Sequence, residues 1–538
     1  MNPRCALGVY GSAFVLLSSL VACTGDASDS ADTQDASGPN DSGSTLDGMD
    51  DADSSSVPDL VSDADEICPT TDPAAEEIGY PPTLELLWSR RLEYGSFSSP
   101  VVTDLNQDCR REIILGQGQE LGTGQGGSLS VFDAESGEDV WRASLPQEIY
   151  TSAVLVELNG DAFQEIVVGG RFGMLTALDG ATGNVLWQID PRAEGFPDTI
   201  FNFYTPQLLP DVTDDGRQDL LVAYGGDATR QAFEPRLPGW LYAIDSTSGE
   251  VVLSMQMPDG AETYMSPVIL ERPGQPTLIL FGTGGETHAG SLWAIEQDAF
   301  IEGRTGEVIE LVAPTTTKGV MAPPSLADFD GDGTLDVVVA TFDGRAILLD
   351  GRALTQRWTV RFENAETYAS PAIGYLDADT IPDVFVAYNY GEWAEGYTGS
   401  EAVAIQGGTG QVFWRAISDG IISASPVAVD LNEDGPMEII YFESKETGTS
   451  IQVVSPLSGQ VDFLTSFPGV SLYSTPRLTD VEGDGVLDMV VPFYVGLAPP
   501  RSQLELRVYS VHTPASALRE AWPGYLGSDG RSIWGRSR

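Results

Sequence analysis

Carboxylates recur along the chain at a spacing that can bind a metal ion. The stretch DFDGDGTLD, residues 328–336, places aspartates at positions 1, 3, 5 and 9 of nine residues. Such close like charges repel one another unless water or a cation lies among them. Ca2+ binds six to eight oxygens at about 2.3–2.6 Å, and flexible Asp-rich loops supply them. Glycine at position 6 permits the bend, and the carbonyl at position 7 can add an oxygen.

The same pattern predicts metal loops in six places, each with candidate ligands at positions 1, 3, 5 and 9. The ligand sets are Asp328, Asp330, Asp332 and Asp336; Asp480, Glu482, Asp484 and Asp488; Asp430, Asn432, Asp434 and Glu438; Asp211, Thr213, Asp215 and Asp219; Asp104, Asn106, Asp108 and Glu112; and Glu157, Asn159, Asp161 and Glu165. The alternative is a set of Asx turns that tolerate water and monovalent ions. Because the positions align in several loops, we expect several structural Ca2+ ions.

Three copies depart from the pattern. The Asp104 loop has Cys109 at the bend, where the Asp211, Asp328, Asp430 and Asp480 loops have glycine. The loop that begins at Tyr375 lacks the first ligand, although Asp377 and Asp379 remain. Residues 271–277, ERPGQPT, retain no site.

The loops belong to a unit that recurs about eight times. Each unit begins with a short motif ending in proline, as in YMSP (264–267), YASP (368–371) and YSTP (473–476), and continues through the acidic loop into a run such as DVVVA (336–340). Its second half is a further strand pair, as in LTALDGATGNVLW (175–187). Four short strands per unit, at a period of roughly 50 to 60 residues, predict an all-β fold, a β-propeller. We expect eight four-stranded blades, or seven if the unit around 271–277 is misread.

The two ends of the repeat predict how the ring closes. Residues 84–88, LELLW, precede the first unit and look like a fourth strand, whereas the last unit ends at LELRVYSV (504–511) without one. An N-terminal strand that completes the C-terminal blade would remove two exposed edges at once. We therefore assign residues 79–525 to the propeller and 526–538 to a C-terminal tail.

The N-terminal region has the layout of an export signal. An apolar run from Ala6 to Val21 follows Arg4 and is too short for a comfortable spanning helix of about 20 apolar residues. Its ending, LVAC, resembles a bacterial lipobox, so residues 1–22 are predicted to be a lipoprotein signal peptide and Cys23 to be lipidated. The segment 23–78 is acidic and poor in apolar residues, which predicts a disordered tether. We expect anchoring to the bacterial outer membrane, at the cell surface or on the periplasmic face.

The remainder of the chain is acidic in its own right. Residues 1–66 hold thirteen acids and Arg4, so the rest carries 67 acids and 26 bases, a formal charge of −41. Nucleic-acid binding needs clustered cations, so this balance argues against it. Beyond Cys5 and Cys23 only Cys68 and Cys109 remain, and in an oxidising compartment they are most simply one disulfide.

Aromatic residues recur just before the proline position of several units. They are Phe97, Tyr150, Tyr204, Tyr264, Tyr368 and Tyr473. If the first strand of each blade lines the axis, these residues ring one mouth of the channel, opposite the acidic loops, and could bind sugars or peptide side chains. The alternative is that they pack between neighbouring blades. The tryptophans at 88, 141, 187, 358 and 414 recur on the outer strand, where we expect blade-to-blade packing.

The acidic loops with their proline leads and apolar strands resemble FG-GAP/VCBS repeats, the calcium-loop blades of the integrin alpha-chain propeller and of many bacterial surface proteins. The LTALDGATGNVLW halves are similar to PQQ-like repeats. The resemblance covers nearly all of residues 80–511. It implies Ca2+-stabilised blades used for adhesion or partner binding.

We therefore expect a monomeric, calcium-binding adhesion or ligand-binding module whose partner is a protein or glycan at the cell surface. One alternative is a periplasm-facing scaffold for outer-membrane assembly; another is a Ca2+-assisted polysaccharide lyase or a PQQ-type oxidoreductase. Catalysis is disfavoured, and no catalytic residue is assigned. PQQ-dependent dehydrogenases imply an adjacent cysteine pair, which the chain lacks, and a lyase base would have to come from an arginine or from Lys318 or Lys445.

Overall fold

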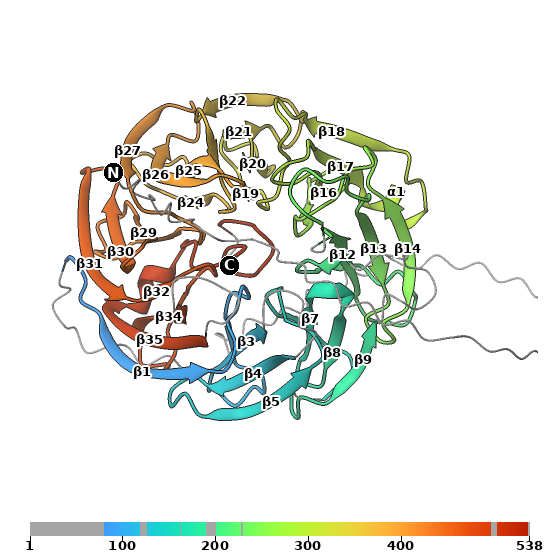
Figure 1. Cartoon of the computed structure of the whole chain (residues 1–538), viewed down its shortest axis with the longest axis horizontal. Coiled ribbons are helices and arrows are strands. Elements are labelled where there is room, and N and C mark those ends of the chain that lie inside the picture. The colour runs from blue at the N-terminus through green and yellow to red at the C-terminus, as the bar shows by residue number, and fades with distance from the viewer. Residues whose placement is uncertain are drawn as a thin grey trace, which may run out of the picture.

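The computed structural model describes residues 80–118, 126–161, 163–189, 201–227, 230–495 and 503–535. The predicted signal peptide, Cys23, the tether and Cys68 lie outside these ranges. The described residues form eight antiparallel sheets set around one axis (Figure 1). The predicted all-β propeller of eight blades is thereby confirmed.

The first four blades follow one another along the chain, each built from the axis outward. Blade 1 holds β2 (Val101–Thr103), β3 (Glu112–Gly118), β4 (Gly127–Asp133) and β5 (Asp139–Leu145); blade 2 holds β6 (Val154–Val156), β7 (Glu165–Gly169), β8 (Leu175–Leu178) and β9 (Val185–Ile189); blade 3 holds β10 (Asn202–Phe203), β11 (Gln207–Leu209), β12 (Asp219–Gly225), β13 (Trp240–Ile244) and β14 (Val251–Gln256); blade 4 holds β15 (Val268–Leu270), β16 (Leu278–Gly282), β17 (Leu292–Glu296) and β18 (Val308–Val312).

The remaining blades repeat this order. Blade 5 holds β19 (Ser325–Ala327), β20 (Asp336–Thr341), β21 (Arg345–Leu349) and β22 (Gln356–Arg361); blade 6 holds β23 (Ala365–Glu366), β24 (Ala372–Gly374), β25 (Asp383–Glu392), β26 (Gly396–Ile405) and β27 (Val412–Ser418); blade 7 holds β28 (Val427–Val429), β29 (Glu438–Lys445), β30 (Gly448–Ser455) and β31 (Gln460–Pro468); blade 8 holds β32 (Val470–Ser471), β33 (Arg477–Thr479), β34 (Val486–Val495), β35 (Gln503–Pro514) and β1 (Glu85–Leu92). Within the described ranges, three single-turn helices complete the fold: η2 (Arg171–Gly173), α1 (Gln297–Ile301) and η3 (Ala515–Leu518).

The hydrophobic pattern of each strand matches its depth in the blade. The second strands β3, β7, β12, β16 and β20 are buried along their whole length, because neighbouring blades cover both faces. This explains their unbroken apolar runs, which resemble those of strands covered on two sides. The outermost strand β5 instead alternates between exposed and partly buried side chains.

Tryptophan side chains on outer strands join one blade to the next. The indole N–H groups of Trp88, Trp141, Trp187 and Trp358 each donate to a backbone carbonyl of the following blade, at 2.6–2.9 Å. The indole ring of Trp141 packs on Gly183, whose φ is +70°, and a Cβ there would lie 2.4 Å from the ring. The predicted blade-to-blade role of these tryptophans agrees with this geometry.

The ring closes through the N-terminal strand. β1 pairs antiparallel with β35 from Glu85 opposite Ser510 to Leu92 opposite Leu504. Trp88 of β1 then donates to Ala134 of blade 1. One strand therefore completes the last blade and fastens it to the first, as the two ends of the repeat predict.

The C-terminal segment, residues 522–535, lies close to the axis (Figure 1). Trp522 exchanges backbone hydrogen bonds with Ala428 of blade 7, and Leu326 of blade 5 does the same with Ser532 and Trp534. Gln207 of blade 3 donates its side-chain amide to the carbonyl of Gly530. This segment, which includes the described part of the predicted tail, residues 526–535, thus joins blades on opposite sides of the axis.

We expect the substitution Trp522→Ala to lower the free energy of unfolding by about 3–5 kcal/mol, because it empties the space of a fully buried aromatic side chain. Chemical denaturation of the purified mature chain measures the change. Leu457→Ala, at a side chain that is half exposed, is the control and should stay within about 0.5 kcal/mol of the parent. Equal values for the two variants would contradict a structural role for the segment.

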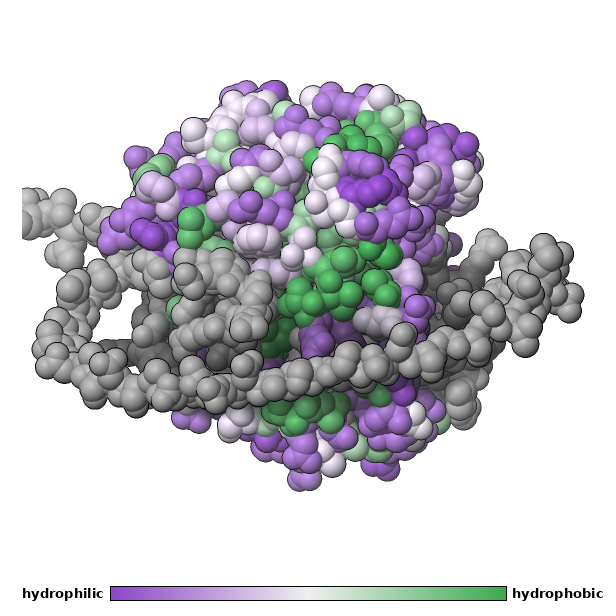
Figure 2. All heavy atoms as spheres, turned by 90° about the vertical axis from the view of Figure 1, so that its right-hand side faces the viewer, coloured by the Kyte–Doolittle hydropathy of each residue, from purple (hydrophilic) through white to green (hydrophobic). Residues whose placement is uncertain are grey.

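The rim of the propeller is mostly hydrophilic, with apolar areas between the polar ones (Figure 2). On this side, exposed apolar side chains stand on the outermost strands: Val185 and Leu186 on β9, Val252 on β14 and Ile309 on β18. Apolar residues exposed in this way are normal for soluble surfaces. No helix among the described residues is long and apolar enough to cross a bilayer.

Candidate functional site: acidic loops and an aromatic ring at opposite ends of the blades

The acidic loops connect the first two full strands of a blade. The carboxylate at position 1 holds each loop in its bent conformation by accepting hydrogen bonds from the loop's own backbone. In blade 5, Asp328 accepts hydrogen bonds from the backbone N–H groups of Gly331 at 2.7 Å and Gly333 at 2.9 Å. Both glycines have positive φ, +75° and +80°, which favours residues without a Cβ. Residues at position 1 of the other loops accept in the same way: Asp104, Glu157, Asp211, Asp430 and Asp480.

Cys109 adopts the positive-φ conformation that glycine has at the same position in the loops of blades 3, 5, 7 and 8. Its φ is +67°, and its backbone N–H donates to Asp104 at 2.9 Å. The sulfur atom of Cys109 is part of a disulfide bond. The predicted partner, Cys68, lies outside the described residues, so that pairing stays a prediction.

Blade 5 brings enough carboxylate oxygen together to hold a cation. One oxygen from each of Asp328, Asp330 and Asp332 lies within 4.8 Å of the others. Arg357 binds Asp330 at 2.8 Å and Asp336 at 3.2 Å, and Arg352 binds Asp332 at 2.9 Å. Four carboxylates and two guanidinium groups leave a charge of −2, which one divalent ion would balance. The donor set, hard oxygens on an exposed loop, fits Ca2+.

The carboxylate at position 9 makes a backbone contact in seven blades. One of its oxygens accepts the N–H of the residue at position 2, at 2.6–3.3 Å. The acceptors are Glu112, Glu165, Asp219, Asp336, Asp383, Glu438 and Asp488. In blade 5 the second oxygen of Asp336 also accepts from Gly351, in the turn before the outer strand. Position 9, assigned from sequence as a metal ligand, therefore also clamps the inner hairpin of the blade.

Burial of these carboxylates raises their pKa values, and the neighbouring loop acids raise them further. The pKa is raised to about 6 for Asp336, about 7 for Glu112 and Asp383, and about 8 for Glu438 and Asp488. Backbone hydrogen bonds oppose the shift but do not cancel it. Ionised forms of these groups therefore need a compensating positive charge.

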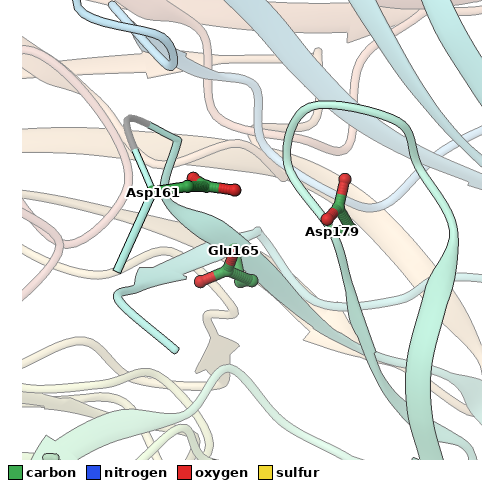
Figure 3. Close-up of side chains that lie close together, drawn as sticks. All are labelled: Asp161, Glu165 and Asp179. Carbon is green, nitrogen blue, oxygen red and sulfur yellow. The ribbon is translucent and has the colours of Figure 1, made fainter. Parts of the chain in front are cut away.

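Blade 2 adds a carboxylate that the nine-residue pattern does not contain. Asp179, in the turn between β8 and β9, lies with Asp161 and Glu165, so that one oxygen of each is within 4.8 Å of the others (Figure 3). Equivalent turns also reach the loop in other blades: Thr247 donates to Asp215 at 2.6 Å, and Arg352 contacts Asp332. The sequence shows Asp179 only as a turn residue in LDGATG. A comparison of the two halves of one unit could have suggested it.

The two remaining loops differ in the expected places. In blade 4, Arg272 donates to the carbonyl of Pro276 at 2.8 Å within residues 271–277. In blade 6, Tyr375 replaces the first ligand, and its ring packs against Trp534 of the C-terminal segment, 4.8 Å between centroids.

The six aromatic residues predicted to form a ring lie at the other end of the blades. In blade 3, Leu209 pairs with Asp219 beside the acidic loop, whereas Asn202, two residues before Tyr204, pairs with Gly225 at the far end of β12. Five members touch in series, with centroid distances of 5.6–6.2 Å: Tyr473, Phe97, Tyr150, Tyr204 and Tyr264. Tyr368 packs instead against Phe342, at 4.9 Å. All except Tyr204 keep partly exposed surface. We call these six residues the aromatic ring.

Buried ion pairs lie behind the aromatic ring. Glu148 and Arg171 are 2.7 Å apart, Glu366 and Lys318 2.6 Å, and Glu262 and Arg236 3.6 Å. Each glutamate stands two residues before a ring tyrosine, as in QEIY (147–150), AETY (261–264) and AETY (365–368). This Glu-x-Tyr repeat is the signal that could have identified the three acids from sequence. Tyr264 donates to Glu262 at 2.8 Å, which ties ring and ion pair together.

Comparison with known proteins places the chain among β-propellers of one family. The model of the FAM234A/B beta-propeller matches residues 126–416. FAM234B of Mus musculus is 23% identical over 402 residues, 69% of this chain and 61% of that protein. FAM234A of Bos taurus is 23% identical over 452 residues, 78% of this chain and 75% of that protein. The match thus spans less than two thirds of mouse FAM234B. A propeller family is confirmed, and it is that of FAM234A/B; the FG-GAP/VCBS likeness stays a prediction.

Solved structures share the fold at low sequence identity. A europium-containing methanol dehydrogenase matches with a TM-score of 0.56 and 13% identity, over 79% of this chain and 93% of that chain. The exotype rhamnogalacturonan lyase YesX matches with a TM-score of 0.52 and 15% identity, over 82% of this chain and 76% of that chain. These likenesses show the propeller fold alone.

Proposed function

This chain belongs to the FAM234A/B beta-propeller family, and from that premise we propose that it is a binding module of the cell envelope whose ligand is a protein or a glycan. The observation that supports this most is the aromatic ring. Side chains from six blades gather at one end of the axis, and most remain partly exposed. Aromatic faces of this kind stack on sugars and receive peptide side chains.

Buried ion pairs lie behind the aromatic ring. Because truncating one partner of such a pair is costly, we expect the glutamates and their cations to keep their positions. Ca2+ in the acidic loops would stabilise the opposite end of each blade. In this proposal the metal is structural, and the ligand binds at the other end without chemistry.

Tyr264→Ala and Tyr368→Ala in the purified mature chain are expected to weaken capture on a glycan and peptide array about tenfold or more, which corresponds to a loss of about 1.4 kcal/mol of binding free energy. The melting temperature should hardly change, because both side chains are partly exposed. Phe463→Ala, at a mostly exposed aromatic side chain of β31, is the matched control and should bind like the parent. A large fall in melting temperature with unchanged capture would instead support packing between blades.

We further propose that Cys23 carries the lipid anchor and that the propeller faces the cell exterior. Metabolic labelling with a fatty acid, compared between the parent and Cys23→Ser, tests the anchor. Protease shaving of intact cells tests the exposure: removal of the propeller supports an adhesion module. Protection of the propeller would favour the alternative, a periplasm-facing scaffold for outer-membrane assembly.

A further inference from the structure

One carboxylate reaches the aromatic ring from a loop rather than from a blade edge. Glu286 lies between β16 and β17, in a loop held by the N–H of Gly284, which donates to Glu262 at 2.7 Å, and by that of Gly319, which donates to Gly285 at 2.9 Å. A Cβ on Gly285 would lie 2.7 Å from the ring of Tyr264, so the loop passes directly against that tyrosine. Tyr368 donates to Glu286 at 3.3 Å.

Glu286 faces tyrosines from several blades at once. Its negative charge is among the causes, after burial, that raise the pKa values of Tyr150 in blade 2, Tyr204 in blade 3 and Tyr368 in blade 6, in addition to Tyr264. Together with the hydrogen bond from Tyr368 and the contact of its loop with Tyr264, this places the carboxylate among the tyrosines of the aromatic ring.

The acidic residues around the aromatic ring outnumber the cations paired with them. Four acids lie around the ring, Glu148, Glu262, Glu286 and Glu366, and three cations, Arg171, Arg236 and Lys318, are paired with the other three acids. Among the described residues, Glu286 has no ion pair within 4.0 Å. With all four acids ionised, four negative charges would face three positive ones. Burial raises the pKa of Glu286, so its ionised form needs a further positive charge beside it.

The aromatic ring already binds one cation of the chain itself, Arg171. The guanidinium of Arg171 lies 4.5 Å from the centroid of Tyr150 and 5.6 Å from that of Phe97. Cation–π attraction of this kind is strongest where water is excluded. No cation–π contact within the described ranges involves Tyr204, Tyr264 or Tyr368, which are the tyrosines around Glu286.

We infer that the ligand bound at the aromatic ring carries an organic cation, an ammonium or guanidinium group, which pairs with Glu286 beside Tyr264 and Tyr368. The inference rests on the proposed binding function and specifies the chemistry of the ligand. The cation completes the pattern that Glu148, Arg171 and Tyr150 already form in blade 2: a carboxylate, a positive charge and an aromatic face. The source of the cation is a lysine or arginine side chain of a partner or a free amine.

Calorimetric titration of the full mature chain, loaded with Ca2+, tests the inference with three capped residues. The probes are N-acetyl-arginine methylamide, N-acetyl-lysine methylamide and the neutral N-acetyl-norleucine methylamide. The two cationic probes are expected to bind about tenfold or more tightly than the neutral one, because only they can pair with the carboxylate of Glu286. Equal binding of the neutral probe, or no binding of either cationic probe, overturns the inference.

Substitutions test whether Glu286 and Tyr368 are the residues that bind the cationic probes. Glu286→Gln removes the charge and keeps the shape, and it is expected to weaken cationic probes about tenfold or more. Glu250→Gln, at an exposed residue in the turn between β13 and β14, which reaches the acidic loop at the opposite end of blade 3, is the matched control and should bind like the parent. Tyr368→Leu keeps Glu286 but removes an aromatic face, so it should also weaken the cationic probes. Unchanged affinity in Glu286→Gln overturns the inference.

Two comparisons separate the possible outcomes. An arginine within a peptide that binds about tenfold more tightly than the capped residue assigns the cation to a partner protein, whereas tighter binding of methylguanidinium or spermidine assigns it to a free amine. A ligand from the array that is lost in Tyr264→Ala but kept in Glu286→Gln overturns the cation inference while the proposed binding function stands. Ligands that are indifferent to every ring substitution overturn both.

Discussion

Chelation of divalent ions is expected to lower the melting temperature of the purified mature chain substantially, and excess Ca2+ to restore it better than Mg2+. A ligand that binds only the folded state stabilises it by about 2.7 kcal/mol per site at a hundredfold excess over Kd. Several loops of this kind would add their contributions. Mg2+ demands a rigid octahedral shell, which flexible loops of carboxylates and backbone carbonyls supply poorly. Differential scanning calorimetry with EDTA and with each added ion measures the effect.

Calcium binding can also be tested at a single loop by substituting its carboxylates. The double substitution Asp328→Asn and Asp330→Asn removes two of the three clustered carboxylates of blade 5, so elemental analysis should find about one calcium fewer per chain. Glu307→Gln on blade 4, whose inner loop retains no site, is the control and should leave the calcium content unchanged. A dialysed parent without bound calcium, together with an unfolding curve that ignores EDTA, would contradict the metal-loop hypothesis.

The propeller could be predicted because its evidence is local and repeated. Each unit contains its own turn residues and its own apolar second strand, so eight copies of a weak pattern gave one strong prediction. The closing strand could be predicted in the same way, because LELLW at 84–88 resembled a fourth strand but belonged to no unit of its own. The structure pairs this strand with β35. Most of the aromatic residues recurred three residues before a proline or its equivalent, with Tyr204 one residue closer, and this predicted that they lie at one level of the axis.

The parts that the sequence did not reveal come from different blades or from different turns of one blade. Glu286 belongs to a loop of blade 4 but faces tyrosines of blades 2, 3 and 6, and no spacing along the chain encodes that meeting. Asp179 joins Asp161 and Glu165 only because the outer turn folds back over the inner loop. The C-terminal segment shows the same limit, since its contacts with β19 and β28 cross more than one blade.

Position 9 of the acidic loops illustrates a different limit. A carboxylate there satisfies two demands, oxygen for a metal and an acceptor for the backbone N–H at position 2. Both demands select Asp or Glu, so the pattern alone cannot separate them. In blade 5 the structure shows the backbone demand directly, because Asp336 accepts hydrogen bonds from the N–H groups of Phe329 and Gly351 and also contacts Arg357. The loops therefore have a structural reason to keep this acid even where an ion binds through positions 1, 3 and 5.

In the presence of EDTA, the chain is expected to be more stable near pH 5 than near pH 8. The five position-9 carboxylates with pKa values of about 6 to 8 have ordinary values near 4 in the unfolded chain. A carboxyl whose pKa is raised on folding gives its full stability below the unfolded pKa and loses it as pH rises through the folded pKa. Each rise of one in pKa corresponds to about 1.4 kcal/mol, so the summed loss should reach several kcal/mol. Melting temperatures measured from pH 5 to 8 test this.

Saturation with Ca2+ should remove most of this pH dependence, because a bound cation favours the ionised carboxylates. His288 acts in the opposite direction: burial and the charge of Arg236 lower its pKa, so it destabilises the fold as pH falls through the unfolded value near 6.5. One histidine cannot outweigh five carboxyls. Asp488→Asn, which stays neutral, should flatten the slope in EDTA, whereas Glu446→Gln at an exposed site should not. A chelated protein that grows more stable from pH 5 to 8 would show that these acids are ionised and compensated without any metal.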